Sequence, residues 1–283
     1  MRDFLDLTKP RITVLILICT AVGHFFGTAG PFHAALLMHA LLGTALMASG
    51  TAALNQWYEA ESDAKMRRTC KRPLASGRMK RLHGLIFGVL LSVAGFADLW
   101  LGTNALAAAL GLFTLVTYIF LYTPLKRRSA VCTTVGALPG AMPPLIGYAA
   151  ASGVLDTSAL ALFLILFVWQ FPHFYAIAWM YREDYARGGI KMLPVIEPDG
   201  ESTARRVVAC SVLLIPISLV PRLLGMTGSI YAASAIAAGM ALLYYGVRLG
   251  RERSTAAARH VLLASVLYLP ILLGVMVLDR HAV

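Results

Sequence analysis

Three side chains that carry oxygen donors recur at every fourth position near the end of a long apolar stretch: Asn55, Glu59 and Asp63. If this stretch is a helix, the three share one face and lie about 6 Å apart from one turn to the next. Two carboxylates and an amide on one face suit Mg²⁺, which prefers oxygen ligands and also binds phosphate oxygens. The spacing therefore predicts a magnesium site on a helix.

A cluster of cations follows the three donors. It comprises Lys65, Arg67, Arg68, Lys71 and Arg72. Lysine and arginine beside a metal site suit a polyanionic phosphate, because both bind phosphate oxygens through charge-assisted hydrogen bonds. Together the two features predict a site for magnesium and a diphosphate.

A second loop again combines acids with bases. Asp184 is followed by Arg187 and Lys191, with Gly188 and Gly189 between them. The glycines would let the backbone turn tightly and approach a ligand closely. An ordinary loop with local ion pairs at the end of a helix is the alternative interpretation.

Two more segments hold candidate residues. Tyr122, Lys126 and Arg127 end an apolar run, where they indicate either a phosphate contact or an aromatic and basic anchor at the membrane surface. His173 lies inside another apolar run. A polar side chain there is costly in lipid and is a functional candidate, although a hydrogen bond between helices is the simpler explanation.

The composition defines the elements that must position these residues. Of the 283 residues, 58% are apolar and 14% are charged, and the mean hydropathy is +0.71. This balance excludes a soluble globular domain and predicts a polytopic membrane protein. Nine apolar runs are long enough to span a bilayer as helices. They cover residues 12–29, 34–57, 82–102, 104–123, 131–151, 158–180, 207–224, 228–249 and 260–278.

We therefore expect an all-α fold: a single integral-membrane domain, residues 1–283, with about nine transmembrane helices around a central cavity. If the N-terminus is cytoplasmic, 23 of the 25 Lys and Arg fall in cytoplasmic segments, and only Arg222 and Arg280 fall outside. By the positive-inside rule, this predicts a cytoplasmic N-terminus, an external C-terminus and a site near the cytoplasmic face. The bilayer then explains the net charge of +11, and no nucleic-acid partner is expected.

The cysteines argue against several kinds of site. Cys19, Cys70, Cys132 and Cys210 are scattered, with no CxxC or CxxCH spacing. A structural zinc site, a disulfide framework and covalently attached haem are therefore not expected. The first apolar run is followed at once by others, so it is expected to be a retained span and not a cleaved signal peptide.

The spaced donors belong to a longer pattern. Asn55-x-x-x-Glu59-x-x-x-Asp63, followed by Lys-Met-x-Arg-Thr-x-x-Arg-Pro-Leu, resembles the signature of the UbiA-type intramembrane prenyltransferases. Further segments resemble the branch of that family that prenylates haem. They are Lys9-Pro10-Arg11 and residues 122–128, 139–148, 169–178 and 184–195.

Two positions depart from the wider family pattern. Glu59 stands where the family usually has Asp, and it still supplies oxygens. Met180 stands four residues before Asp184, where the second motif usually has another Asp, so one bound metal or two remains open.

The resemblance implies an activity and a set of site residues. The substrates would be farnesyl diphosphate and haem B, the product haem O, the cofactor Mg²⁺ and the location a bacterial cell membrane. The metal would be held by Asn55, Glu59 and Asp63, with Asp184 holding a second metal or orienting a basic partner. The diphosphate would be bound by Arg67, Arg68, Arg72, Lys126, Arg127 and Lys191.

Two further roles follow from the same resemblance and from the chemistry. The ring of Tyr122 would stabilise an allylic cation, and His173 is the candidate for a haem contact. A downstream partner, such as a haem A synthase or a haem–copper oxidase under assembly, is left open.

Three alternatives are weighed against this prediction. An aromatic prenyltransferase of quinone or chlorophyll biosynthesis would share the diphosphate site but would keep both acids of the second motif. A transporter would suit the many spans, but its charged residues belong at mid-membrane and not at helix ends. A haem-binding subunit without catalysis would explain His173 but not the three donors and their trailing cations.

Overall fold

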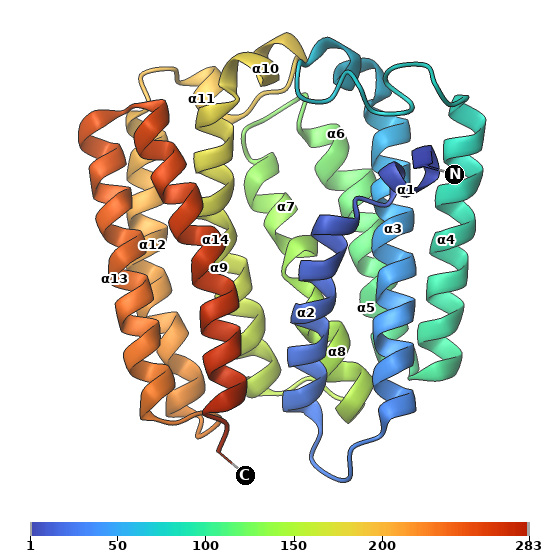
Figure 1. Ribbon diagram of the computed structural model, residues 1–283, viewed down its shortest axis with the longest axis vertical. Helices are drawn as coiled ribbons and strands as arrows, with labels where there is room; N and C mark the ends of the chain where they lie inside the picture. Colours follow the sequence, from blue (N-terminus) through green and yellow to red (C-terminus); the bar gives the residue numbers. More distant parts are fainter. Residues whose placement is uncertain (1, 282–283) are drawn as a thin grey trace. The chain divides into compact units, whose positions relative to one another are not determined.

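The computed structural model describes residues 2–281, and its named secondary structure is entirely helical. The helices form two compact units (Figure 1). The first comprises the chain as far as Leu155 together with Asp184–Ile190, and the second comprises Asp156–Glu183 and the chain from Lys191 onward. The predicted all-α helical fold is confirmed, whereas the single domain and its central cavity stay predictions.

The first unit is built around α3 (Ala34–Lys65), against which α4 (Arg81–Gly102) packs. Its other elements are α1 (Arg2–Leu7), α2 (Pro10–Gly27), α5 (Ala105–Val116), the π-helix η1 (Thr117–Tyr122), α6 (Thr123–Leu125), α7 (Cys132–Gly140), α8 (Met142–Ser152) and most of α10 (Arg182–Arg187). With 32 residues, α3 is about 48 Å long, well beyond the hydrocarbon thickness of a bilayer. Its polar last turns can therefore lie outside the hydrocarbon.

The second unit contains three long helices packed on α9 or on one another. Its elements are α9 (Thr157–Met180), α11 (Leu193–Ile196), α12 (Glu201–Leu223), α13 (Ser229–Glu252) and α14 (Thr255–Leu278). Side-chain oxygens cap two of these helices at the N-terminus: Asp156 accepts from the backbone N–H groups of Ser158 and Ala159 before α9, and Ser254 accepts from Ala257 before α14.

Eight helical segments of residues 2–281 are long and apolar enough to cross a membrane, which makes the chain an integral membrane protein. They are α2, α3, α4, the continuous run Ala105–Leu125, α9, α12, α13 and α14. The count agrees with the prediction of about nine, because the remaining predicted span, residues 131–151, is divided between α7 and α8.

The division of this span has a local cause. Pro143 and Pro144 have no N–H group, and proline suits the first turn of a helix, where that group would have no partner within the helix. The chain accordingly breaks at Ala141 and restarts as α8, where residues 142–150 are all buried. Irregular backbone at membrane depth is stable when protein surrounds it, and the burial of α8 meets that condition.

Helices α2 and α8 approach so closely that their contact requires glycine. A Cβ atom on Gly147 would lie 1.9 Å from the carbonyl oxygen of Thr20, and one on Gly23 would lie 2.0 Å from that of Pro144. Small residues allow such backbone approach between membrane helices, where dispersion drives association. This contact fixes α8 against α2 in the first unit.

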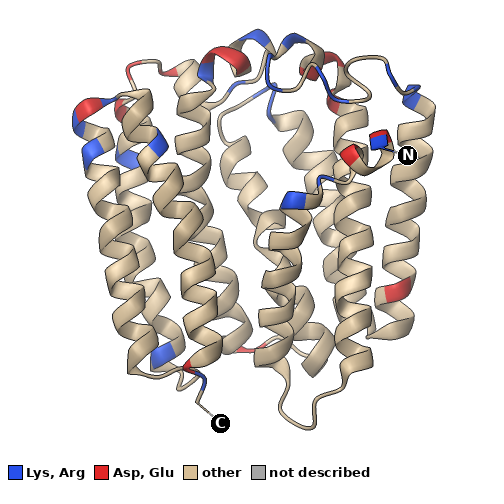
Figure 2. Cartoon of the chain, viewed as in Figure 1, with Lys and Arg blue, Asp and Glu red and all other residues tan. Residues whose placement is uncertain are grey.

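The charged residues follow the same organisation. In each unit most Lys and Arg gather at one end of the helices, and the apolar middle of the helices carries almost none (Figure 2). This agrees with the asymmetry on which the predicted topology rests. Which end faces the cytoplasm stays a prediction.

Replacing Gly147 with alanine tests the α2–α8 contact. We expect Gly147→Ala to destabilise the detergent-solubilised protein by roughly 1–3 kcal/mol, because the methyl group overlaps backbone that cannot move aside. Gly274→Ala is the matched control, since a Cβ there meets nothing within 4 Å. Thermal unfolding of the two variants is the measurement, and equal melting temperatures would contradict the packing.

Candidate active site

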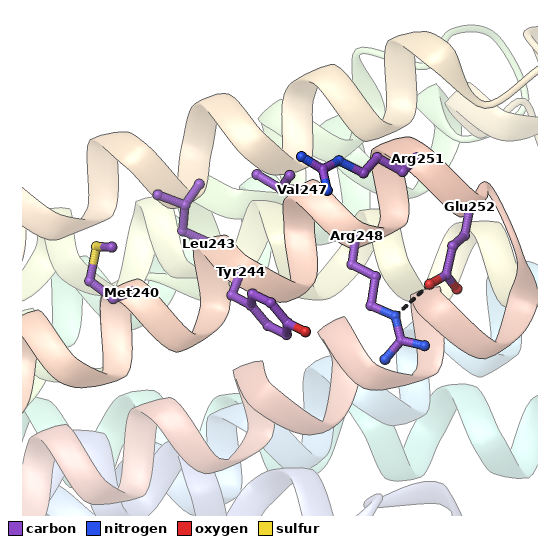
Figure 3. Close-up of a pocket in the computed structure, with 7 residues that line it drawn as sticks. All are labelled: Met240, Leu243, Tyr244, Val247, Arg248, Arg251 and Glu252. Atoms are coloured by element: carbon purple, nitrogen blue, oxygen red, sulfur yellow. Dashed lines mark hydrogen bonds and ion pairs between the residues drawn. The ribbon is translucent and has the colours of Figure 1, made fainter.

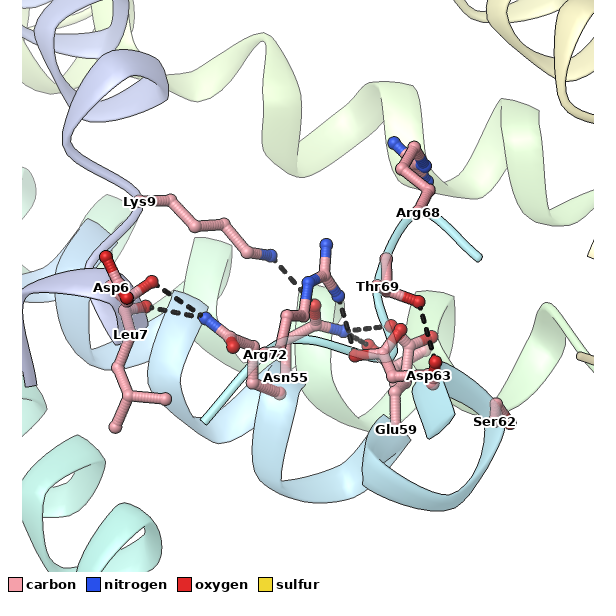
Figure 4. Close-up of polar contacts among 12 residues, drawn as sticks. Asp6, Leu7, Lys9, Asn55, Glu59, Ser62, Asp63, Arg68, Thr69 and Arg72 are labelled. Atoms are coloured by element: carbon pink, nitrogen blue, oxygen red, sulfur yellow. Dashed lines mark hydrogen bonds and ion pairs between the residues drawn. The ribbon is translucent and has the colours of Figure 1, made fainter. Parts of the chain in front are cut away.

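The three predicted donors lie along one face of α3, and all are buried: Asn55 is 1% exposed, Glu59 7% and Asp63 2%. Asn55 Nδ2 donates to Glu59 Oε2 at 3.0 Å, so the first two side chains touch. Because α3 continues unbroken to Lys65, Asp63 follows on the next turn (Figure 4). The structure thus brings the three donors together, and their role as metal ligands stays a prediction.

Each donor is held by a cation from a different segment. Lys126 Nζ lies 2.9 Å from Glu59 Oε1, and an Arg72 guanidinium nitrogen lies 2.6 Å from Asp63 Oδ2. Lys9 Nζ donates to Asn55 Oδ1 at 3.2 Å, reaching across from the start of α2 (Figure 4). Three cations therefore surround a buried row of oxygen donors, an arrangement that can bind both a metal and an anion.

Two of these cations have shifted pKa values. Burial, together with the positive charges of Arg72 and Lys126, lowers the pKa of Lys9 to about 7. Burial alone would also lower the pKa of Lys126, but the carboxylate of Glu59 outweighs it and raises that pKa well above its ordinary value. Lys126 is thus a fixed positive charge in this site.

The π-helix η1 precedes Thr123 and Lys126 in the chain and sets the orientation of this segment. Over η1 the helix widens by one residue, and the Thr123 N–H donates to the carbonyl of Tyr118. Thr123 then accepts a hydrogen bond from Asn55 Nδ2 at 3.3 Å, while Lys126 Nζ lies 4.4 Å from the centre of the Tyr122 ring. π-Bulges are frequent at functional sites, and this one precedes two residues that contact α3, Thr123 and Lys126.

The N-terminal segment is attached to the same helix. Gln56 Nε2 donates to the carbonyl oxygens of Asp6 and Leu7, at 3.3 and 3.1 Å. Leu7 is fully buried in a cluster with Ala53, Ala60, Leu74 and Met79. These contacts hold Lys9 beside Asn55.

Three predicted diphosphate ligands, Arg67, Arg68 and Arg127, are exposed residues in the segments that adjoin this row. Arg127 donates to Ser62 Oγ at 2.5 Å, and Arg68 donates to the hydroxyl of Tyr185 at 3.3 Å. The side chain of Arg67 is exposed. All three belong to the first unit and can meet an anion from the aqueous side.

Asp184 is also buried in the first unit, but it contacts backbone N–H groups, which Glu59 and Asp63 do not. Its two carboxylate oxygens accept the backbone N–H groups of Arg67 and Arg68, each at 3.1 Å, and it pairs with Arg187. Burial would raise the pKa of Asp184, but the hydrogen bonds from Arg187 and from the two N–H groups lower it. The predicted role of Asp184, holding a second metal or orienting a basic partner, stays a prediction.

The two remaining candidates belong to the second unit. His173 accepts or donates a hydrogen bond with Ser265 Oγ at 2.9 Å, and its ring stacks on Trp169. An interhelical hydrogen bond, the simpler explanation of His173, is therefore present, and its haem contact stays a prediction. Lys191 is exposed, and its role also stays a prediction.

The sequence prediction missed three contributors: Lys9, Thr123 and Ser62. Lys9 and Thr123 were noted only as parts of family-like segments, and Ser62 stood unremarked beside Asp63. The available signal for Lys9 was its position, directly before a span that contains few other polar side chains.

A separate groove of about 570 Å³ lies on α13 in the second unit. Met240, Leu243, Tyr244 and Val247 form its apolar part, and Arg248, Arg251 and Glu252 form its polar end (Figure 3). Arg248 is paired with Glu252 at 2.5 Å. None of the predicted site residues lines this groove, which has the character of a lipid-facing helix surface.

The whole chain shows the class of protein to which this site belongs. Residues 16–272 match the model of the UbiA prenyltransferase family. Since this match covers most of the sequence, the chain belongs to the UbiA prenyltransferase family and is a membrane-embedded enzyme of prenyl transfer. Membership of this family argues against two of the alternatives considered from the sequence, a transporter and a haem-binding subunit without catalysis.

Individual relatives narrow the class. The chain is 58% identical to a protoheme IX farnesyltransferase of Solibacter usitatus over 99% of both chains. It is 49% identical to that of Koribacter versatilis, over 99% of this chain and 94% of the relative, and 42% identical to that of Salinibacter ruber, over 98% of both.

Solved structures show the same fold at low identity. A digeranylgeranylglyceryl phosphate synthase superposes with a TM-score of 0.81 at 16% identity, covering 98% of this chain and 97% of its own. A UbiA homologue from Archaeoglobus fulgidus bound to GPP and Mg²⁺ superposes with a TM-score of 0.72 at 16% identity, covering 97% of this chain and 99% of its own. The predicted UbiA-type fold is thereby confirmed.

Arg72 and its neighbour Lys71 provide a matched test of the site. We expect Arg72→Ala to lower kcat/KM for the prenyl diphosphate about 10- to 100-fold, because a charge-assisted hydrogen bond to a buried carboxylate is lost. Lys71 is exposed and belongs to the same loop, so Lys71→Ala should change the value little. Steady-state release of diphosphate is the measurement, and equal losses would contradict the specific role of Arg72.

The buried pair of Lys126 and Glu59 makes a prediction about stability. Lys126→Met leaves the Glu59 carboxylate without its nearest cation, which typically costs about 3 kcal/mol or more. Adding Glu59→Gln removes the uncompensated charge and should restore part of the melting temperature. Thermal unfolding of the single and double variants checks this, and a double variant less stable than Lys126→Met would argue against the pairing.

Proposed function

We propose that this chain transfers a farnesyl group from farnesyl diphosphate to a vinyl group of protohaem IX, giving haem O and diphosphate. The observation that carries the proposal is the 58% identity, over 99% of both chains, to a protoheme IX farnesyltransferase. The buried donors of α3 and the cations around them supply the groups that ionisation of an allylic diphosphate requires.

The residues fit a magnesium ion by their chemistry. Asn55 Oδ1 and the carboxylates of Glu59 and Asp63 are oxygen donors on successive turns of one helix, the ligand type that Mg²⁺ requires. When bound, Mg²⁺ neutralises charge on the departing diphosphate. A homologue of the same fold carries GPP and Mg²⁺, which supports the assignment.

The surrounding cations bind the diphosphate itself. Arg72 and Lys126 already lie within hydrogen-bond distance of the carboxylates and can reach phosphate oxygens held by the same row. Lys9 extends this set, and Arg67, Arg68, Arg127 and Lys191 are the proposed outer contacts. Their positive charge stabilises diphosphate as the carbon–oxygen bond breaks and the farnesyl carbon becomes cationic.

The acceptor step joins the farnesyl carbon to the terminal carbon of the vinyl group. The positive charge then lies on the carbon attached to the porphyrin, and a water molecule adds there and loses a proton, leaving a hydroxyl. Tyr122 presents its ring to a cation, here Lys126, and the same ring is proposed to stabilise the allylic cation. His173 remains the proposed haem contact.

The proposed location follows the distribution of charge. The N-terminus and the donor row of α3 would lie at the cytoplasmic side of a bacterial cell membrane, and the C-terminus outside. The product would pass to an enzyme that oxidises haem O or to a haem–copper oxidase under assembly.

The test supplies membranes containing this chain with haem B, farnesyl diphosphate and Mg²⁺, and separates the extracted haems by mass spectrometry. We expect a haem that has gained one farnesyl group and one hydroxyl, absent after EDTA treatment and with Asp63→Ala. Asp63→Ala should remain folded, as checked by its melting temperature.

Unmodified haem with the folded wild-type protein would contradict the proposal. Hydroxybenzoate- and naphthoate-type rings would then be offered with the same donor, since prenylation of either would identify the aromatic branch of the family.

A further inference from the structure

We propose that Ser265 is a positioning residue that holds His173 with its ring proton on Nδ1, so that Nε2 presents an unshared electron pair as an axial ligand to the iron of the haem substrate. The inference deepens the proposed function and rests on it for the identity of the acceptor, an iron porphyrin. Both residues lie in the second unit, His173 on α9 and Ser265 on α14.

The imidazole of His173 contacts Ser265 through one of its nitrogens. Nδ1 lies 2.9 Å from Ser265 Oγ, and Ser265 is fully buried. The distance alone does not identify the donor, because a neutral imidazole carries its proton on either nitrogen and a hydroxyl both donates and accepts. The assignment depends on the other group that contacts this hydroxyl.

That other group is a backbone carbonyl. Ser265 Oγ lies 2.7 Å from the carbonyl oxygen of Leu262, and a carbonyl can only accept. Two oxygens at this distance attract each other only with a proton between them, so the single hydroxyl proton of Ser265 points to Leu262. The hydroxyl is then left to accept from His173, and the imidazole proton must be on Nδ1.

A second contact fixes the plane of the His173 ring. The indole of Trp169, one turn earlier on α9, stacks on this ring, with the ring centres 4.9 Å apart and 24° between the planes. The indole is itself held, since Trp169 Nε1 donates to the carbonyl oxygen of Ser265 at 2.8 Å. One residue of α14 therefore anchors both rings, His173 through its hydroxyl and Trp169 through its carbonyl.

The other ring nitrogen of His173 has no partner in the protein. None of residues 2–281 forms a hydrogen bond with Nε2, although the ring belongs to the membrane-spanning helix α9. An unpaired polar atom is costly in a medium that supplies little water. The ring is only half-buried, which leaves room for a ligand to approach. An electron-pair acceptor would therefore complete the contacts of this side chain.

This arrangement is typical of histidines that bind metals. Such a histidine coordinates through one nitrogen and donates the proton of the other to a neighbouring acceptor, which fixes the tautomer and the direction of the ring. Neutral imidazole is the commonest metal ligand among side chains, and it holds the haem iron in several classes of haem protein. Coordination of the iron would hold the porphyrin at its centre and leave the vinyl groups at its edge free to react.

His260 provides a matched control in the same unit. It lies on α14, the helix that carries Ser265, and its ring also stacks on an aromatic ring, that of Tyr245. Its Nδ1 is buried without a hydrogen-bond partner among the described residues, so no neighbour fixes its tautomer there. The control therefore matches His173 in residue type and ring stacking but lacks the contact with a hydroxyl.

The experiment measures binding to the purified full-length protein in detergent, without farnesyl diphosphate. Ferric haem and metal-free protoporphyrin IX are titrated against the wild type and against His173→Phe, His260→Phe, Ser265→Ala and Ser265→Thr. Absorption and electron paramagnetic resonance spectra identify the iron ligand, and melting temperatures show that each variant folds. Protoporphyrin has the same ring and side chains as haem but no iron, so it separates coordination from packing.

We expect a nitrogen ligand on the iron in the wild type. His173→Phe should lose this ligand and raise the Kd for haem about 10-fold or more, with the Kd for protoporphyrin little changed. His260→Phe should behave as the wild type. Ser265→Ala should raise the Kd for haem about 10-fold, as for other residues that orient a metal ligand. Ser265→Thr keeps the hydroxyl and should restore most of the affinity.

An iron spectrum that His173→Phe leaves unchanged, or equal losses of affinity for haem and protoporphyrin, would overturn the axial ligand. A Kd for haem unaffected by Ser265→Ala would overturn the positioning role. If His173→Phe does not fold, His173→Gln is held to the same pattern.

Failure of this inference and failure of the proposed function give different results. If the wild type prenylates haem while His173→Phe keeps the wild-type iron spectrum, only the inference is contradicted. If the wild type coordinates haem through His173 but does not prenylate it, only the proposed function is contradicted.

Discussion

The site depends on one constraint: two carboxylates are buried beside an amide on one helix face, and each carboxylate needs a positive partner. An uncompensated buried charge costs several kcal/mol, so α3 can keep Glu59 and Asp63 only with Lys126 and Arg72 in place. These cations come from the segment after η1 and from the loop after α3. The first unit must therefore fold around the donor row, and the cations that stabilise it are also those that suit an anionic substrate.

The donor row itself could be predicted from the sequence, because a spacing of four places residues on one helix face whatever their surroundings. The partners could not. Lys9 meets Asn55 across 46 residues, and Asp184 meets Arg67 across 117. Contacts between loops follow no periodicity, so the sequence could name Arg72, Lys126 and Asp184 as candidates but could not assign the side chain that each one contacts.

For the membrane spans, too, the sequence predicted the regular features but not the local irregularities. Apolar length and the placement of Lys and Arg were sufficient to find the long helices. The fifth span was predicted as a single helix over residues 131–151, and only the structure shows the break at Ala141 and the burial of α8 after it. The π-helix before Thr123 had no signal, because one extra residue in a turn changes hydrogen bonding without changing the apolar pattern.

The length of α3 explains why the site lies where it does. Prenyl transfer places opposite demands on its surroundings, since the diphosphate is polyanionic and water-soluble while the prenyl cation must be kept from water. A 32-residue helix passes through the hydrocarbon and beyond it, so its apolar turns and its donor-bearing turns are continuous. The end of such a helix can hold the charged leaving group at the surface and direct the prenyl chain toward the membrane interior. The proposed site of Asn55, Glu59 and Asp63, in the last turns of α3, would meet both demands.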